Sequence, residues 1–289
     1  MQSDGTDKLI KINALVKAAA VMFGVLLFQI LLQLVFGIIF KAMFGQSITE
    51  SESAAAAYNI VFYEPLYHIF YGLTAGLIAL LIYNTYYRGE PNSFYAMALK
   101  SGSVIKCVKR VVTLVLFGLA MQLLAYSVLN MVYLYAASSP FFQEYASVSD
   151  KLSGNSTPLI FLYTLIFAPF AEEYIFRGLI YRSARTGFGF MPANIIQAFL
   201  FALYHGNLIQ GIYAFVLGLL LGYAAEYKKS MPEIVGLHMA VNISGIFVVP
   251  VFMDILCSTV GSIVSFGIGT AVSLAFIVWI MASGILKRD

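Results

Sequence analysis

The sequence predicts an all-α polytopic membrane protein, built as a bundle of about eight transmembrane helices. Of its 289 residues, 61% are hydrophobic and only 11% are charged, and the mean hydropathy is +0.86. Soluble domains carry roughly a quarter charged residues, so this composition is typical of an integral membrane protein. Apolar stretches close to 20 residues long, enough to span a bilayer as a helix, also recur along the chain.

Eight apolar segments are expected, and short polar turns separate most of them. They cover residues 18–40, 60–86, 111–136, 158–181, 192–205, 208–225, 232–253 and 261–286. The first is far longer than the core of a signal peptide, so we expect it to remain as a spanning helix. The fifth is too short to cross about 30 Å of hydrocarbon. Pro158, Pro192 and Pro232 each stand at a helix start, where proline is tolerated.

The lysines and arginines predict an orientation. They gather before the first segment, between the second and third, and after the fourth, sixth and eighth, whereas residues 41–57 and 137–157 hold few. The positive-inside rule then places both termini in the cytoplasm. This alternation closes only with eight segments, and we expect the membrane to be a bacterial plasma membrane. The basic stretch 88–110 is interpreted as a connector that faces lipid headgroups.

Charge and cysteine usage exclude some functions. The formal net charge is only +3 and no dense basic patch is present, so nucleic acid is not an expected partner. Cys107 and Cys257 fit no metal-ligand spacing. No internal repeat and no stretch long enough for a separate soluble domain stand out. Residues 1–289 are therefore expected to form a single integral membrane domain.

Charged residues interrupt the fourth segment, in FAPFAEEYIFRGLIYR (167–182). A charge in the bilayer centre costs about 3 kcal/mol on insertion scales, so these residues need a reason. Glu173 and Arg177 are four apart and can pair on one helix face. Glu172 points about 100° away from Glu173, which leaves it for chemistry. Pro169 lies about one turn earlier and is expected to loosen the helix before the acidic pair.

Polar residues also recur at helical spacing in the fifth and seventh segments. The largely polar stripe of the fifth segment consists of Asn194, Gln197, Phe201 and His205. In the seventh, His238 and Asn242 share a face that Gly245 continues. At about 1.5 Å per residue, Glu172, His205 and His238 lie about 15, 21 and 9 Å from the expected cytoplasmic helix ends. Such depths are compatible with one shared layer, so we expect an intramembrane active-site cavity.

Three motifs, in this order, resemble those of a known family. EEYIFR (172–177) matches an EExxxR motif, FALYH (201–205) an FxxxH motif and HMAVN (238–242) an HxxxN motif. The set resembles the CPBP family of intramembrane proteases, which includes Ras-converting CAAX endopeptidases and bacteriocin self-immunity proteins. The motif-bearing core covers about residues 158–255, and the family's usual architecture agrees with eight spans.

The resemblance implies an intramembrane endopeptidase that cleaves near the C-terminus or the membrane-proximal part of a peptide or lipidated-protein substrate. The catalytic residues that it implies are Glu172, His205, His238 and Asn242. The residues that would support the site are Glu173, Arg177 and Phe201. Glu172 would activate water together with His205, and the other two catalytic residues would stabilise the oxyanion. The expected partners are thus the lipid bilayer and such a substrate.

Other readings of the same residues remain open. There is no HExxH motif, and no serine or cysteine stands in a nucleophile motif. No cofactor is favoured, because each group has a role without metal. The alternative is a zinc ion held by Glu172, His205 and His238, with water in the fourth position. A non-catalytic scaffold or bacteriocin immunity protein is a further alternative. A transporter is disfavoured by the lack of repeats and of paired broken helices.

Overall fold

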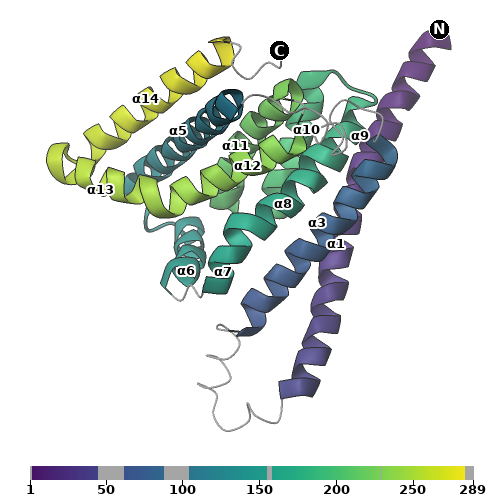
Figure 1. Cartoon of the computed structure of the whole chain (residues 1–289), viewed down its shortest axis with the longest axis horizontal. Coiled ribbons are helices and arrows are strands. Elements are labelled where there is room, and N and C mark those ends of the chain that lie inside the picture. Colours follow the sequence, from purple (N-terminus) through teal and green to yellow (C-terminus); the bar gives the residue numbers. More distant parts are fainter. Residues whose placement is uncertain (1, 45–61, 88–103, 155–157, 229, 284–289) are drawn as a thin grey trace. The chain divides into compact units, whose positions relative to one another are not determined.

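The computed structural model describes residues 2–44, 62–87, 104–154, 158–228 and 230–283 (Figure 1). Helices dominate these residues, and none of them lies in a strand. Seven helical runs among them are long and apolar enough to cross a membrane: Gly5–Met43, Glu64–Tyr86, Val111–Ala136, Pro158–Arg185, Leu208–Tyr227, Met231–Val260 and Ser262–Ser283. The fifth segment is the shorter apolar helix α10 (Phe190–Tyr204), of 15 residues. The protein is an all-α, polytopic membrane protein, as predicted.

Some of the segments expected to connect the spans lie outside the described residues, and one of them contains a helix. The loop 45–57, the stretch 88–103 and the last residues of the eighth segment lie outside the described residues. Residues 137–157 were expected only to connect the third and fourth segments, but α6 (Pro140–Gly154) occupies most of them. Ser139 caps this helix by accepting a hydrogen bond from the N–H of Phe142 at 3.3 Å, and proline takes the first helical position.

Contacts divide the chain into two compact units. The first unit comprises residues 1–82 and 146–188, and the second comprises residues 83–145 and 189–289. The expectation of a single membrane domain stays a prediction. The units place Glu172 in the first and both motif histidines in the second.

In the first unit, two long helices lie side by side (Figure 1). α1 (Gln2–Phe44) packs on α3 (Glu64–Tyr87) through aromatic rings, with the centroids of Phe36 and Tyr67 5.9 Å apart. The hydroxyl of Tyr67 donates a hydrogen bond to the carbonyl of Gln29 at 3.1 Å. This bond satisfies a polar group where lipid could not, which helps to hold the two helices together.

The fourth span is a single helical run with changes of pitch. It consists of α7 (Pro158–Leu162), a π-helical turn η2 (Tyr163–Phe167), α8 (Ala168–Glu172), a longer π-helical segment η3 (Glu173–Ile180) and α9 (Tyr181–Arg185). α1 contacts both η3 and α9. The motif EEYIFR therefore begins at the junction of α8 and η3, and its residues are covered by protein on the side of α1.

Proline explains two of the three π-helical elements that follow α6. η2 ends two residues before Pro169, and η4 (Ser244–Val248) ends two residues before Pro250 in α13 (Val249–Val260). Proline has no N–H to donate four residues back, and its ring clashes with that carbonyl. In both places the closing N–H bonds the carbonyl five residues back, which widens the turn. The predicted loosening of the helix before the acidic pair is thus confirmed.

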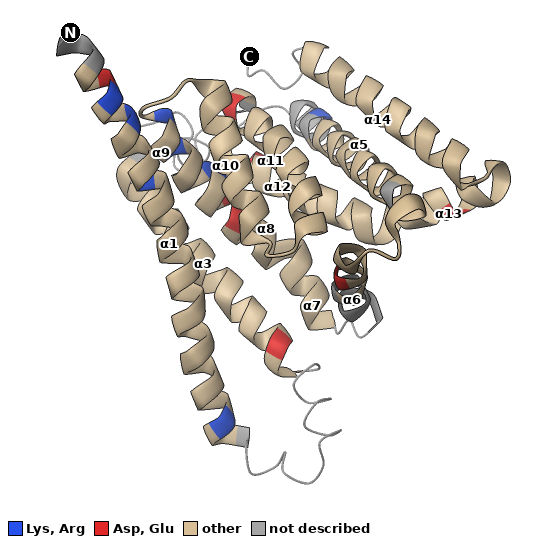
Figure 2. Cartoon of the chain, turned by 180° about the vertical axis from the view of Figure 1, so that it is seen from behind, with Lys and Arg blue, Asp and Glu red and all other residues tan. Residues whose placement is uncertain are grey.

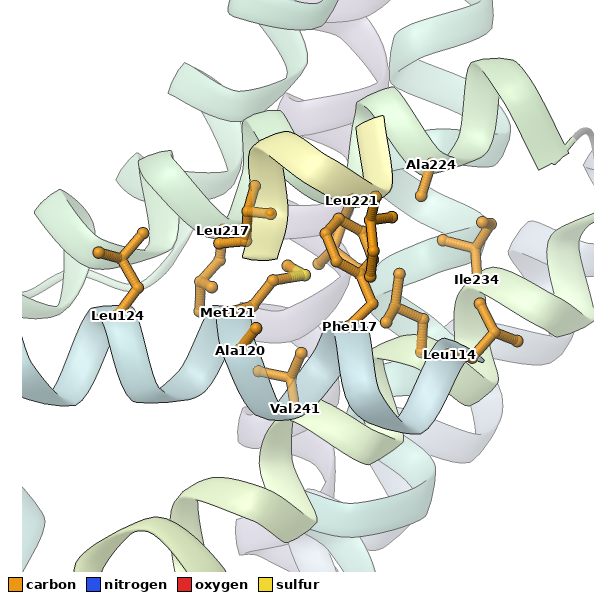
Figure 3. Packing of buried hydrophobic residues seen from close by; sticks show 13 residues of the cluster. Leu114, Phe117, Ala120, Met121, Leu124, Leu217, Leu221, Ala224, Ile234 and Val241 are labelled. Carbon is orange, nitrogen blue, oxygen red and sulfur yellow. The ribbon is translucent and has the colours of Figure 1, made fainter. Parts of the chain in front are cut away.

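The second unit has a continuous apolar core (Figure 3). Its helices are α5 (Val104–Ala136), α10, α11 (Leu208–Lys228), α12 (Met231–Ile243), η4, α13 and α14 (Ser262–Ser283). α5 contacts both α12 and α14, and α10 packs on α11. Phe117 and Met121 of α5 are fully buried against Leu221 of α11 and Ile234 of α12. This core fixes α12, and hence His238, relative to α5.

Charged side chains are sparse on the described helices, and α14 carries none (Figure 2). The exceptions inside a span are therefore informative, because an intramembrane charge is retained only where it has a partner or a function. The fourth span holds three of them close together, Glu172, Glu173 and Arg177.

Candidate active site

Glu173 and Arg177 form a buried ion pair in the first unit. Arg177 Nη1 donates a hydrogen bond to Glu173 Oε1 at 2.9 Å, and both side chains are 0% exposed. Residues 171–180 are all buried, so neither charge meets lipid. The pairing predicted from their spacing is confirmed, and the two opposite charges of the pair compensate each other.

Glu172 lies beside this pair and is 9% exposed. Its carboxylate interacts electrostatically with Arg177, more weakly than Glu173 does, and with the hydroxyl of Tyr163 on η2. The ring of Tyr163 in turn lies 5.0 Å from the ring of His68 on α3. The carboxylate therefore sits among groups of the same unit that can orient it, while a small part of its surface stays accessible.

Two glycines of α3 let this helix approach the acidic segment closely. A Cβ added at Gly72 would lie 3.0 Å from the Cβ of Phe167, and one at Gly76 would overlap the ring of Phe170. Small residues at such contacts allow helix backbones to pack in a membrane. α3 thereby supports the turn η2 and the residues that lead directly into Glu172.

His205 follows α10 in the second unit and has a defined tautomer. Its Nδ1 lies 2.8 Å from the carbonyl oxygen of Phe201. A carbonyl only accepts hydrogen bonds, so Nδ1 must carry the proton. In the neutral ring, Nε2 is then the nitrogen with the lone pair, which is the form that a general base or a metal ligand requires. The FxxxH spacing thus prepares the imidazole for chemistry.

Phe201 contacts both motif histidines. Its ring centroid lies 4.7 Å from that of His205 and 6.1 Å from that of His238, with each imidazole nearly perpendicular to it. Phe201 itself is 2% exposed, and His238 is 7% exposed. The predicted supporting role of Phe201 agrees with this geometry, because one rigid ring holds an imidazole from α10 and another from α12.

The polar stripe of α10 divides into two parts. Asn194 Nδ2 donates to the carbonyl of Leu219 at 3.0 Å, and Gln197 Nε2 donates to the carbonyl of Gly218 at 2.9 Å. A Cβ added at Gly222 would overlap the side chains of both amides. Asn194 and Gln197 therefore attach α10 to α11, and GLLLG (218–222) forms part of the face of α11 that packs on α10.

Asn242 lies one turn after His238, near the end of α12, and is half-buried. η4 begins two residues later, so the pitch of the helix changes directly after the HxxxN motif. π-helical turns of this kind are frequent at functional sites. An imidazole and an amide can each donate a hydrogen bond, which suits a developing oxyanion.

The described residues therefore bring the predicted site residues together in two sets. Glu172, Glu173 and Arg177 adjoin one another in the first unit, and Phe201, His205 and His238 do so in the second. The meeting of Glu172 with the histidines stays a prediction. A zinc site on the predicted ligands would take its carboxylate from one unit and its two imidazoles from the other.

Comparison with known proteins bears directly on this stretch. Residues 154–244 match the family model described as type II CAAX prenyl endopeptidase Rce1-like. The matched range contains all three motifs. This range is similar to an Rce1-like domain. The match supports the CPBP, CAAX-protease assignment that the motifs suggested, and it supports an intramembrane protease in general. No curated protein and no solved structure matched the chain.

Sequence reasoning missed polar residues that lie close to the motifs. Tyr163 of η2 interacts with Glu172, and the ring of His68 on α3 lies beside the ring of Tyr163. Gln122 of α5 lies outside the matched range but in the second unit, where it contacts Gly245. The signal was present, because an amide in the middle of an apolar span is expensive and marks a possible site.

Proposed function

We propose that the protein is an intramembrane endopeptidase in which Glu172 and His205 together activate the attacking water. The observation that carries the proposal is the hydrogen bond from His205 Nδ1–H to the carbonyl of Phe201, because it makes Nε2 the basic nitrogen of the ring. A basic nitrogen of this kind accepts a hydrogen bond from the water and so orients it for proton transfer to Glu172. The Rce1-like match over residues 154–244 supports the same reaction class.

The proposed reaction begins with attack of water on a peptide carbonyl carbon. Glu172 accepts one proton of the water as the new C–O bond forms, and His205 holds the oxygen in line. The carbonyl oxygen becomes an oxyanion that accepts hydrogen bonds from His238 and Asn242. Collapse of the tetrahedral intermediate breaks the C–N bond, and the proton held by Glu172 passes to the leaving amine.

Glu173 and Arg177 would support this chemistry without taking part in it. Their ion pair is fully buried one residue beyond Glu172, so it fixes the helix that carries the general base. A rigid supporting shell matters because small displacements of reacting groups cost rate. Phe201 would do the same for the two imidazoles.

The proposed substrate class follows the description of the matching family, a CAAX prenyl endopeptidase. We expect a peptide whose C-terminal CAAX sequence carries a prenyl group on its cysteine, delivered from the lipid phase. Cleavage would then fall near the C-terminus. A lipid chain of this kind partitions into the bilayer, which brings the scissile bond to an enzyme embedded there.

A zinc-dependent version uses the same residues. Two imidazoles and a carboxylate form an acceptable catalytic ligand set, and His205 has the arrangement of a metal-binding histidine, with Nδ1–H on a backbone carbonyl. Glu172, His205 and His238 would hold the ion, which would lower the pKa of its bound water to about 7. We favour the metal-free reaction because every one of these residues already has a role in it.

Hydrolysis of a farnesylated CAAX peptide by the purified protein in lipid nanodiscs tests the proposal. Mass spectrometry should show one cleavage near the C-terminus with the wild type and none with Glu172→Gln. Activity should persist in a chelator, with substoichiometric zinc by elemental analysis. Loss of activity in chelator, restored by stoichiometric zinc, would establish the zinc version instead. A folded wild type that cleaves neither this peptide nor any peptide in a membrane-peptide comparison would favour a non-catalytic scaffold.

The orientation belongs to the proposal as well. Both termini are expected on the cytoplasmic side of a bacterial plasma membrane, since basic residues gather at the start of α1 and at the end of α9. In a chain with its two native cysteines replaced by serine, Arg185→Cys should resist a membrane-impermeant maleimide in intact cells. Labelling of this cysteine from outside the cell would show that the orientation is the opposite of the one proposed.

A further inference from the structure

Gln122 is an amide in the middle of the apolar span Val111–Ala136. It is half-buried, and its side chain forms no hydrogen bond with any described residue. The other amide of this span behaves differently, because Asn130 Nδ2 donates to the carbonyl of Tyr126 on its own helix at 2.9 Å. A carboxamide without partners is unfavourable in hydrocarbon, so Gln122 is expected to meet a group that comes from outside the described chain.

The position of Gln122 is set by close packing of α5 on α12. A Cβ added at Gly118 would lie 3.0 Å from the Cβ of Ala240 and 3.1 Å from the backbone nitrogen of Val241. One turn further along α5, a Cβ added at Gly245 would lie 2.5 Å from Gln122 Nε2. The contacts advance in the same direction on both helices, so the two run parallel here. Gly245 leaves room for the amide because it has no side chain.

Gly245 continues the helix face of the HxxxN motif. It follows Asn242 by three residues and His238 by seven, which are the spacings of neighbours on one face. The amide of Gln122 therefore lies one turn beyond Asn242, against the part of the helix where η4 widens the backbone. All of these residues belong to the second unit.

We propose that Gln122 binds the backbone of the peptide substrate next to the scissile bond. A carboxamide offers both a donor and an acceptor, and a peptide group is the ligand that complements both at once. This inference rests on the proposed peptidase function. It adds a substrate-binding residue from α5, a helix outside residues 154–244, to the residues of the three motifs.

A structural role for the amide predicts a different result. α5 is already held by apolar contacts of Phe117, Met121 and Leu124, which do not involve Gln122. Replacement by the similarly sized, apolar leucine should therefore leave the thermal stability unchanged or raise it. The loss of the amide should therefore weaken substrate binding without lowering the thermal stability.

Kinetics with the farnesylated CAAX peptide provide the first test. Gln122→Leu should raise KM by about two- to tenfold, the worth of a typical hydrogen bond, with kcat within about twofold. Gln122→Asn, which keeps a shorter carboxamide, should lie between Gln122→Leu and the wild type. Asn130→Leu, the matched amide on the same helix, should leave KM unchanged. Equal KM values for Gln122→Leu and the wild type would refute the inference, and so would a loss of kcat accompanied by a loss of stability.

Cysteine protection provides a second test that needs no turnover. In a Glu172→Gln chain without native cysteines, Gln122→Cys should react with a water-soluble maleimide faster than Leu116→Cys, whose position on α5 is exposed. The farnesylated peptide should slow this reaction several-fold, whereas farnesylcysteine methyl ester, which lacks the peptide, should not. Absence of protection by the peptide overturns the inference. Absence of hydrolysis by the wild type, with protection intact, overturns the proposed reaction alone.

Discussion

Two long helical runs carry charged or polar motif residues, and both contain a π-helical turn that ends two residues before a proline. In Pro158–Arg185 the turn and Pro169 precede the motif, and residues 171–180 are all buried. In Met231–Val260 the motif precedes the turn and Pro250, and the helix around Asn242 is only partly buried. The π-helical turn with its proline thus precedes the motif in the first run and follows the motif in the second.

The difference follows from the charge of the residues concerned. Glu173 and Arg177 are ions, and an ion in hydrocarbon requires a partner and an enclosure of protein, both of which the first unit supplies. His238 and Asn242 can act as neutral hydrogen-bond donors, so their helix tolerates an open side that a substrate could reach. The first run is therefore expected to respond to mutation in stability as well as in rate, and the second mainly in rate.

The largest effect is expected for the proposed general base. Glu172→Gln should lower kcat by about 10²- to 10⁴-fold, because proton transfer by a positioned carboxylate is lost. The amide is nearly isosteric, so the unfolding midpoint in detergent should stay close to that of the wild type. A variant that retains more than a tenth of the activity would remove Glu172 from the reaction.

Loss of its neighbour should act through stability instead. Glu173→Gln leaves Arg177 buried without its carboxylate partner, which is expected to lower the free energy of unfolding by about 3–5 kcal/mol. The double variant Glu173→Gln, Arg177→Met should regain most of this loss, because no uncompensated charge remains. If the single variant is as stable as the wild type, the two adjacent glutamates are not divided between structure and chemistry as proposed.

On the second run, Asn242→Ala should remove one oxyanion donor and reduce kcat by about 10²- to 10³-fold. The unfolding midpoint should change less than it does for Glu173→Gln, since Asn242→Ala leaves no buried charge without its partner. Met239→Ala, on the same helix and also partly buried, serves as the matched control and should keep its activity. Equal rates for Asn242→Ala and this control would show that the HxxxN amide is dispensable.

The smallest effects are expected for the two prolines. Pro169→Ala should slow hydrolysis by up to about tenfold. The substitution would alter the pitch of η2, which leads into Glu172, and a misplacement of a reacting group by 1 Å can cost about 10²-fold in rate. The glycine contacts of α3 limit that displacement. Pro250→Ala changes a turn that follows the motif, so its rate should stay within about twofold of the wild type. A larger loss for Pro250→Ala would reverse this comparison of the two runs.

The sequence by itself determined the membrane-spanning segments, the Glu173–Arg177 pair and the three motifs. Hydropathy reports the transfer of each segment from water to lipid, and i, i+4 spacing is a property of any helix, so both can be read without knowing the neighbours. The prolines likewise mark where η2 and η4 occur. η3 has no such mark, and α6 was missed because its sequence is too polar to register as a span.

Only the tertiary structure decided which polar residues join neighbouring helices and which remain candidates for chemistry. Asn194 and Gln197 bond to backbone carbonyls of α11, whereas Phe201 and His205 contact each other in the candidate site, although all four share one stripe. The contact of Phe201 with His238 and of Gln122 with Gly245 likewise joins residues far apart in the chain. In a membrane, apolar side chains gain little free energy when they exchange contacts with lipid for contacts with one another. Helix pairing therefore depends on the fit of small residues and hydrogen bonds between specific faces, which no count along a single segment contains.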